Sequence, residues 1–152
     1  MTYRREEILV RILAVINGIK SAASIKTVSR NRIDFDDTQL PAVGVLEGDE
    51  EVATNTLGRN DRASRRPYIV TATPQIFVRV GSLPEVVGTD LNALLAAIIK
   101  AVEDDAELTS LSMDDGGIHY AGKQSQLHAA RQMIGADAMV FAIKYLLYPD
   151  RL

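Results

Sequence analysis

The sequence predicts an α+β fold, with a single domain in which a mostly antiparallel β-sheet of about five strands carries two α-helices packed on one face. Two segments, residues 1–18 and 83–105, place apolar side chains at the period of a helix. Five other segments have the β-branched, apolar or alternating character of strands, and their connections suit antiparallel pairing. A chain of 152 residues with 47% hydrophobic content fits one core, so we expect residues 1–152 to form one domain.

The first helix is predicted within residues 1–18 and the second within residues 83–105. Gly18 marks the end of the first helix, and Thr89 or Asp90 can cap the second. The two apolar stripes comprise Ile8, Leu9, Ile12, Leu13, Val15, Ile16 and Ile19, and then Leu91, Leu94, Leu95, Ile98, Ile99 and Val102. The acidic cluster that follows is predicted to be solvated beyond the last firm turn, because the helix dipole disfavours negative charge there. This cluster consists of Glu103, Asp104, Asp105 and Glu107.

The strands are predicted from β-branched or alternating segments separated by turn residues. They lie within residues 24–33, 42–48, 68–81, 113–122 and 136–152. Residues 34–41 have turn chemistry, and residues 123–135 are predicted to be a polar connection. Pro74 lies inside the third strand and cannot donate a ladder hydrogen bond, so it marks an edge position, a bulge or a junction of two segments.

The overall charge and the amino-acid composition exclude several classes of protein. The 17 basic and 20 acidic residues give a formal charge of −3, so nothing global favours nucleic acid or an anionic membrane. The absence of cysteine excludes disulfides and thiolate sites. Glu6, Glu7 and Arg11 interrupt the N-terminal apolar residues, which therefore predict an amphipathic helix and not a secretion signal. No apolar run is long enough to span a membrane, so we expect a soluble protein.

A search of the sequence for catalytic and metal-binding motifs finds none. It contains no phosphate-binding glycine loop and no G-x-S-x-G elbow. His119 and His128 are too far apart for a metal-binding helix motif, and we expect each to be a surface or structural histidine. The acidic groups at residues 34–37 and 48–51 lack the spacing of an EF-hand and are better interpreted as solvated turns. We therefore expect no catalytic residue, metal site or cofactor, and no enzymatic activity.

The most unusual segment is a long charged loop predicted at about residues 47–66, acidic at its start and basic at its end. Eight of its charged residues carry this pattern: Glu47, Asp49, Glu50 and Glu51, followed by Arg59, Arg62, Arg65 and Arg66. One interpretation is a solvated flexible loop with no task. A second is phosphate binding by the arginines, which would make affinity fall with salt. A third is contact with another copy of the chain or with a partner that has matching patches.

The third interpretation uses both halves of the segment. No aromatic side chain lies among the arginines to stack on bases, and the adjacent acidic residues would repel nucleic acid. A head-to-tail contact between complementary halves closes into a ring when the rotation allows it. Exposed charge pairs contribute only about 0 to 1 kcal/mol each, so they would set register while buried apolar contacts supply most of the affinity.

The order of segments resembles the tail terminator proteins, also called tail-completion or minor tail proteins, of long-tailed bacteriophages and prophages. The similarity runs from the N-terminal helix to the closing "GADAMVFAIKYLLYPDRL" and includes "TPQIFVRVG", "VGTDLNALLAAIIKAV" and "IHYAG". Its most specific part is "SRNRIDFDDTQLPAVGVLEGDEE", with the pattern R-N-R, L-P-A and L-x-G-D-E-E. The remainder is pattern more than motif.

The resemblance implies the same α+β fold and a mechanical function without catalytic residues. Such proteins form a ring, six-fold in the family, on the head-proximal end of the tail tube in the virion, after assembly in the host cytoplasm. The ring ends polymerisation of the tube protein and presents a surface to the neck of the filled head. The implied partners are further copies of the chain, the tail tube protein and a neck or head-completion protein, with no membrane and no specific nucleic acid.

On this interpretation the eight charged side chains of the loop lie at a subunit or tube interface and become ordered only on assembly. Three alternatives stay open at this point. The chain could be another head-to-tail joining protein of the neck, a nucleic-acid-associated module that uses residues 59–66, or a small enzyme whose site leaves no local pattern.

Overall fold

The computed structural model describes residues 3–53, 67–83, 85–113, 117–125 and 134–148. Its strands are β1 (Thr27–Arg30), β2 (Ala42–Val52), β3 (Tyr68–Gly81), β4 (Ile118–Ser125) and β5 (Ile134–Leu147). They form a five-stranded sheet in the order β1-β2-β3-β5-β4. β1 pairs with β2 in parallel, and the other three pairings are antiparallel. The predicted α+β domain with a mostly antiparallel sheet is confirmed.

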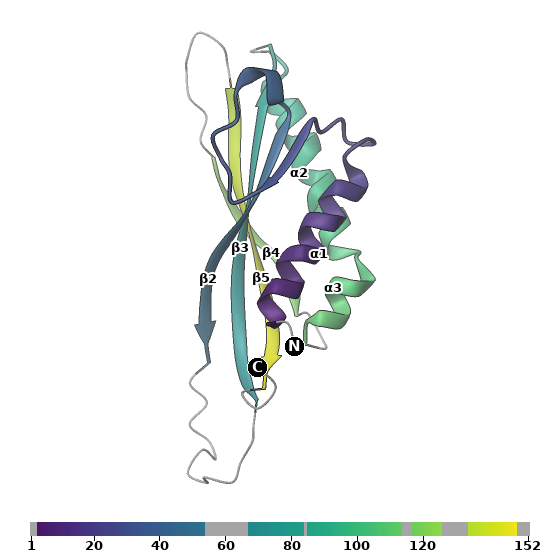
Figure 1. Ribbon diagram of the computed structural model, residues 1–152. Helices are drawn as coiled ribbons and strands as arrows, with labels where there is room; N and C mark the ends of the chain where they lie inside the picture. The colour runs from purple at the N-terminus through teal and green to yellow at the C-terminus, as the bar shows by residue number, and fades with distance from the viewer. Residues whose placement is uncertain (1–2, 54–66, 84, 114–116, 126–133, 149–152) are drawn as a thin grey trace.

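The α-helices lie together on one face of this sheet, and no α-helix of the described residues covers the other face, here called helix-free (Figure 1). They are α1 (Arg4–Ile19), α2 (Val87–Glu103) and the short α3 (Ala106–Leu111). Their apolar stripes pack on the sheet as the helical period predicted, and the fully buried side chains include Ile12, Ile16 and Ile98. Burial of each such side chain stabilises the fold by about 1.5 to 3 kcal/mol, so this layer is the main core.

The start of α2 differs from the sequence prediction. The backbone N–H groups of Val86 and Val87 both donate to the carbonyl of Leu83 at 3.0 Å, which begins the helical turn before Thr89. The predicted caps, Thr89 and Asp90, therefore lie inside the first turns and not at the N-cap. Asp90 instead accepts a hydrogen bond of 2.6 Å from the Ser82 hydroxyl.

The acidic cluster after α2 was predicted to be solvated, and for Asp105 this prediction is wrong. Asp105 caps α3 by accepting a hydrogen bond from the backbone N–H of Leu108 at 2.9 Å. Arg11 of α1 binds the same carboxylate through two nitrogens, at 2.7 and 3.0 Å, and also pairs with Glu107. The hydrogen bond from Arg11 lowers the pKa of Asp105 from its ordinary value. Sequence reasoning missed α3 because its capping residue was assigned to the end of the preceding helix.

β2 contains a bulge opposite Pro74. Leu46 pairs with Gln75 and Asp49 pairs with Thr73, so that Glu47 and Gly48 together oppose Pro74. Two residues opposite one define a β-bulge, and the interruption accommodates a proline that has no N–H to donate. Gly48 has φ +65°, and a Cβ atom there would lie 1.8 Å from the carbonyl oxygen of Thr73. The prediction that Pro74 marks an irregularity of the sheet is confirmed as a bulge.

Part of the helix-free face is covered by the chain itself. Residues 31–41, here called the strap, fold over this face and bury Phe35 in a second small core. This core consists of Phe35, Ala42, Phe77 and Ala136. Arg79 donates to the carbonyl of Phe35 at 2.8 Å, and the Arg32 guanidinium lies 5.2 Å from the centre of the Phe35 ring. The strap approaches so closely that a Cβ at Gly44 would meet the carbonyl oxygen of Arg32 at 2.0 Å.

Two further boundaries differ from the sequence prediction. The strand expected within residues 24–33 is only Thr27–Arg30, because the chain leaves the sheet at Asn31, which adopts φ +54°. β4 continues to Ser125 and β5 begins at Ile134, so both strands enter the predicted polar connection. The polar residues at the end of β4 belong to the sheet because they pair with β5, and the pattern of hydrophobic residues does not predict this pairing.

Candidate subunit interface on the outer half of β2

The four predicted acidic interface residues lie in a strand, which corrects the predicted loop boundary. Glu47, Asp49, Glu50 and Glu51 belong to β2, where residues from Asp49 onward pair with Thr73 and its neighbours in β3. These polar residues are extended because they pair with β3, and they have no alternation of apolar side chains that would predict a strand. Arg59, Arg62, Arg65 and Arg66 lie outside the described residues.

The four acids divide between the two faces of the sheet. On the helix side, Glu50 accepts a hydrogen bond from the Tyr3 hydroxyl at 2.5 Å and pairs with Arg5 at 3.2 Å. Glu47 pairs with Arg30 at 3.1 Å, and Arg30 also makes a bidentate pair with Glu6 of α1 at 2.7 and 2.8 Å. These two acids are therefore bound within their own chain.

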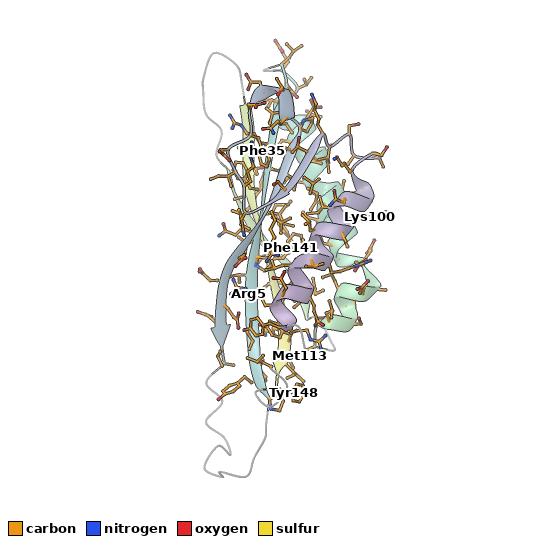
Figure 2. All side chains as sticks on the ribbon, viewed as in Figure 1. Arg5, Phe35, Lys100, Met113, Phe141 and Tyr148 are labelled. Atoms are coloured by element: carbon orange, nitrogen blue, oxygen red, sulfur yellow. The ribbon has the colours of Figure 1, made fainter. Side chains whose placement is uncertain are left out.

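Arg5 holds the bulge of β2 against α1. Its Nη2 donates to the carbonyl oxygens of Glu47 at 3.2 Å and Gly48 at 2.7 Å, while Nη1 donates to Glu50. Figure 2 shows Arg5 beside the lower half of the sheet, away from Phe35. Because α1 packs in the main core, this contact fixes the outer half of β2 to the body of the domain. We call Arg5, Arg30, Glu6, Glu47 and Glu50 the clamp.

The clamp changes the electrostatics of the groups around it. The hydrogen bonds that Arg30 donates to Glu6 lower the pKa of Glu6 and raise the pKa of Arg30. Tyr145 is buried beneath this region, with its hydroxyl 3.5 Å from that of Tyr3. Burial, then the contact with Tyr3, raises the pKa of the Tyr145 phenol. All of these groups thus keep their usual charge states near neutral pH, as a structural network requires.

Asp49 and Glu51 lie on the opposite, helix-free face. Their neighbours across the sheet are Thr73 and Thr71, which alternate with Val70 and Ala72 of the main core. Both carboxylates are exposed, and within the part of the chain that the structure describes neither side chain has an ion-pair partner. These are the two predicted acids that remain accessible to another molecule.

Beyond the strap, no helix or strand among the described residues covers the helix-free face, and this part of the sheet is here called the bare face. The register places its side chains in rows across three strands: Asp49, Thr73 and Ala142, then Glu51, Thr71 and Lys144, then Ile69 and Leu146. The central positions are small, apolar or hydroxylated, while charge lies at the borders, negative on β2 and positive at Lys144. Such a border distinguishes one orientation of a bound partner from the other.

The remaining ionisable groups of the described residues do not converge on a catalytic arrangement. His119 lies in β4 opposite Ala142, and His128 lies outside the described residues. Asp137 is fully buried and its Oδ2 pairs with Lys123 at 2.9 Å, while its Oδ1 has no hydrogen-bond partner among the described residues. Asp36, in the acidic group at residues 34–37, caps a short 3-10 helix (Asp37–Gln39) and also accepts from the Thr38 hydroxyl.

The described ranges contain no group of three or more residues that could hold a metal ion, and no helix of the length and apolarity needed to cross a membrane. A surface hollow of about 470 Å³ lies between the end of α1 and the first half of α2. Alanines line much of it, and Asp90 is the ionisable side chain that the described residues contribute.

Sequence reasoning missed the residues that bind the acids of β2. Arg5 and Arg30 were not distinguished from other surface arginines, although Arg30 begins the R-N-R pattern and Glu47 follows Leu46 in L-x-G-D-E-E. The spacing of 17 residues between Arg30 and Glu47 is the signal that could have found the pair, because β1 and β2 run side by side.

Comparison with models of known protein families gives no match for the chain. Comparison with curated proteins gives no match either.

Proposed function

We propose that the chain is a structural virion protein that forms a ring on the head-proximal end of a bacteriophage tail tube. The ring ends polymerisation of the tube protein and provides the surface that joins the head. Its partners are further copies of itself, the tail tube protein and a neck protein. The proposal rests on the resemblance to tail terminators of long-tailed phages and prophages.

The main support for the proposal comes from the contacts and exposure of residues 30–51, which are the most specific part of the resemblance. Arg30, Glu47 and Gly48 form the clamp and the bulge, and the strap between them covers the small core around Phe35. The same passage leaves Asp49 and Glu51 on the bare face. A passage that is both structural and exposed at its end is suited to carrying a fixed contact surface.

The fold itself supports a binding function over a catalytic one. The carboxylates of the clamp pair with arginines of the same chain, while the bare face offers a broad surface that spans three strands. A flat sheet face with charged borders fits a protein partner better than a small molecule, which binds in concave sites. The described ionisable groups are used in capping, in the clamp and in isolated pairs.

The experiment that tests this function is electron microscopy of particles from the parent phage or prophage after deletion of this reading frame. Filled heads beside detached, abnormally long tail tubes are expected. Detached tails of normal length would instead indicate a neck protein. Normal tails joined to heads would remove both roles, and titration with duplex DNA at two salt concentrations would then test the nucleic-acid alternative.

A further inference from the structure

The bare face has the properties of a surface that another protein segment covers. Its neighbouring region on the same side of the sheet is already covered by the strap, which buries Phe35 against Phe77. The bare face continues that surface toward the ends of β3 and β5, which project beyond the helices in Figure 1. Ile69 and Leu146 are only partly buried there, so a covering segment would remove further apolar area from water.

We infer that the bare face binds the arginine-rich segment, residues 59–66, of a second copy of the chain. The inference rests on the proposed ring and names the surface through which neighbouring copies meet. Asp49 and Glu51 are the accepting carboxylates on one copy, and Arg59, Arg62, Arg65 and Arg66 are the donors on the next.

The charges of the two partners are complementary. Residues 54–66 contain four arginines and one acid, Asp61, so the segment carries 4 − 1 = +3. The β2 border of the bare face carries two exposed carboxylates without ion-pair partners among the described residues. Guanidinium groups bind carboxylates in bidentate geometry, and the methylene stems of arginine cover apolar surface such as Ile69 and Leu146.

Lys144 gives the contact a direction. It lies in the same row as Glu51, with Thr71 of β3 between them. At a strand spacing of about 4.8 Å, Lys144 is roughly 10 Å from the β2 border. Repulsion from Lys144 therefore keeps a basic segment on the β2 side of the face, and an acidic residue of the segment such as Asp61 is suited to the opposite side.

The position of Asp49 along β2 suits contact with a neighbouring copy. β2 and β3 stay paired to the hairpin end, where the backbone N–H of Ala53 donates to the carbonyl of Ile69 at 2.9 Å. Asp49 lies four residues before Ala53, about 13 Å along the strand. Asp49 therefore lies back from the hairpin end, on a face that a neighbouring copy can approach directly.

A contact between two different surfaces of identical chains is head-to-tail. It repeats from copy to copy and closes into a ring when the rotation permits. The outer two acids of β2 and the segment at residues 59–66 are such a pair of surfaces. The two acids of the clamp are not part of the contact, because Arg5 and Arg30 already bind them.

A charge exchange between two variants tests this inference. Variant X carries Asp49→Lys and Glu51→Lys, and variant Y carries Arg62→Glu, Arg65→Glu and Arg66→Glu. Each variant alone presents two surfaces of like charge and is expected to lose self-association. An equimolar mixture restores complementary contacts, so X and Y should alternate in an even-numbered ring. Native mass spectrometry resolves the two masses and measures the composition of each assembly directly.

The same variants are then supplied, singly and together, to the phage from which the reading frame is deleted. Restoration of normal-length tails by the mixture alone is expected. The control carries Glu85→Lys and Asp104→Lys, which make the same change in charge at exposed positions elsewhere, and it should assemble as the unaltered chain does. Circular dichroism establishes that every variant is folded.

Three outcomes would overturn the inference. Self-association of X or Y alone at the level of the unaltered chain would show that these charges do not mediate the contact. Assembly could also be restored by a single chain that carries the changes of both X and Y, and not by the mixture. That result would place the contact within a single copy. Failure of both the mixture and the doubly changed chain to assemble would also contradict the inference. The proposed function is tested separately, by the length of the tails that the deletion phage makes when no variant is supplied.

Discussion

The two faces of the outer half of β2 use the same kind of side chain in opposite ways. On the helix side, Glu47 and Glu50 are bound by arginines and hold the strand to α1. On the bare face, Asp49 and Glu51 are exposed and have no ion-pair partner in the described part of the chain. Charge density in a sequence therefore says little about function until the partner of each charge is known.

The bulge at Gly48 decides which acid belongs to which face. Side chains alternate along a strand, and one extra residue moves all later side chains to the other face. Without the bulge, Asp49 and Glu51 would point toward the helices and Glu50 would point away from Arg5. The glycine thus sets both the clamp and the composition of the bare face.

The largest effect is expected from Gly48→Ala, which breaks the division between the faces. The new Cβ would meet the backbone of Thr73, and the residue has a φ that favours glycine. We expect the free energy of unfolding to fall by about 3 kcal/mol, measured by urea denaturation. Gly88→Ala is the matched control, because its Cβ meets nothing within 4 Å and alanine favours a helix. An equal loss in both variants would contradict the role of the bulge.

A somewhat smaller effect is expected from Arg5→Met, which removes the central donor of the clamp. Glu50 and the carbonyls of Glu47 and Gly48 would lose their partner in a half-buried site. We expect a loss of about 2 kcal/mol and faster hydrogen exchange in β2. Arg4→Met should change stability much less, because its pair with Glu7 is exposed. Unchanged exchange in β2 would show that the clamp does not hold the strand.

The pH dependence of stability sharpens the comparison further. Arg30 lowers the pKa of Glu6 in the folded protein. The stabilisation that this ion pair gives is therefore complete above the pKa of Glu6 in the unfolded chain, and it is lost as the pH falls through the lower pKa of the folded state. Arg30→Met should therefore have a less steep loss of stability between about pH 5 and pH 3 than the unaltered chain. Urea titrations at a series of pH values measure this slope. Equal slopes for Arg30→Met and the unaltered chain in this pH range would contradict a stabilising role of the Arg30–Glu6 pair.

The smallest effect is expected on the bare face. Asp49→Asn together with Glu51→Gln should change the free energy of unfolding of the isolated chain by less than about 0.5 kcal/mol, since the side chains are exposed. The same urea measurement applies. A loss comparable to that of Arg5→Met would mean that these acids serve the fold and are not available to a partner.

The sequence predicted the architecture well where periodic apolar residues determined it. Most residues of the α1 and α2 stripes are buried, and Leu13, Ile19 and Ile99 are partly buried against the same core. In β3, Ile76, Val78 and Val80 face the main core and Phe77 faces the small core, as the alternation predicted. Each of these elements packs a face against the main core, so the pattern of apolar residues and the structure have the same cause.

The features that the sequence did not predict depend on polar contacts between distant segments. α3 begins where Asp105 meets Arg11 of α1, and the clamp joins Arg5 to backbone atoms more than forty positions away. The acidic residues of β2 were assigned to a loop because their strand character comes from pairing with β3. Of the candidate site, the sequence identified the acids, and only the register separated the two that are accessible.

The clamp also determines how the domain responds to mechanical load. A force applied to the outer half of β2 passes through Arg5 to the first turn of α1, and from there into the helix layer that packs on the main core. The outer half of β2 is therefore braced by the body of the domain. A tension carried from copy to copy around a closed assembly would be transmitted to the main core of each molecule.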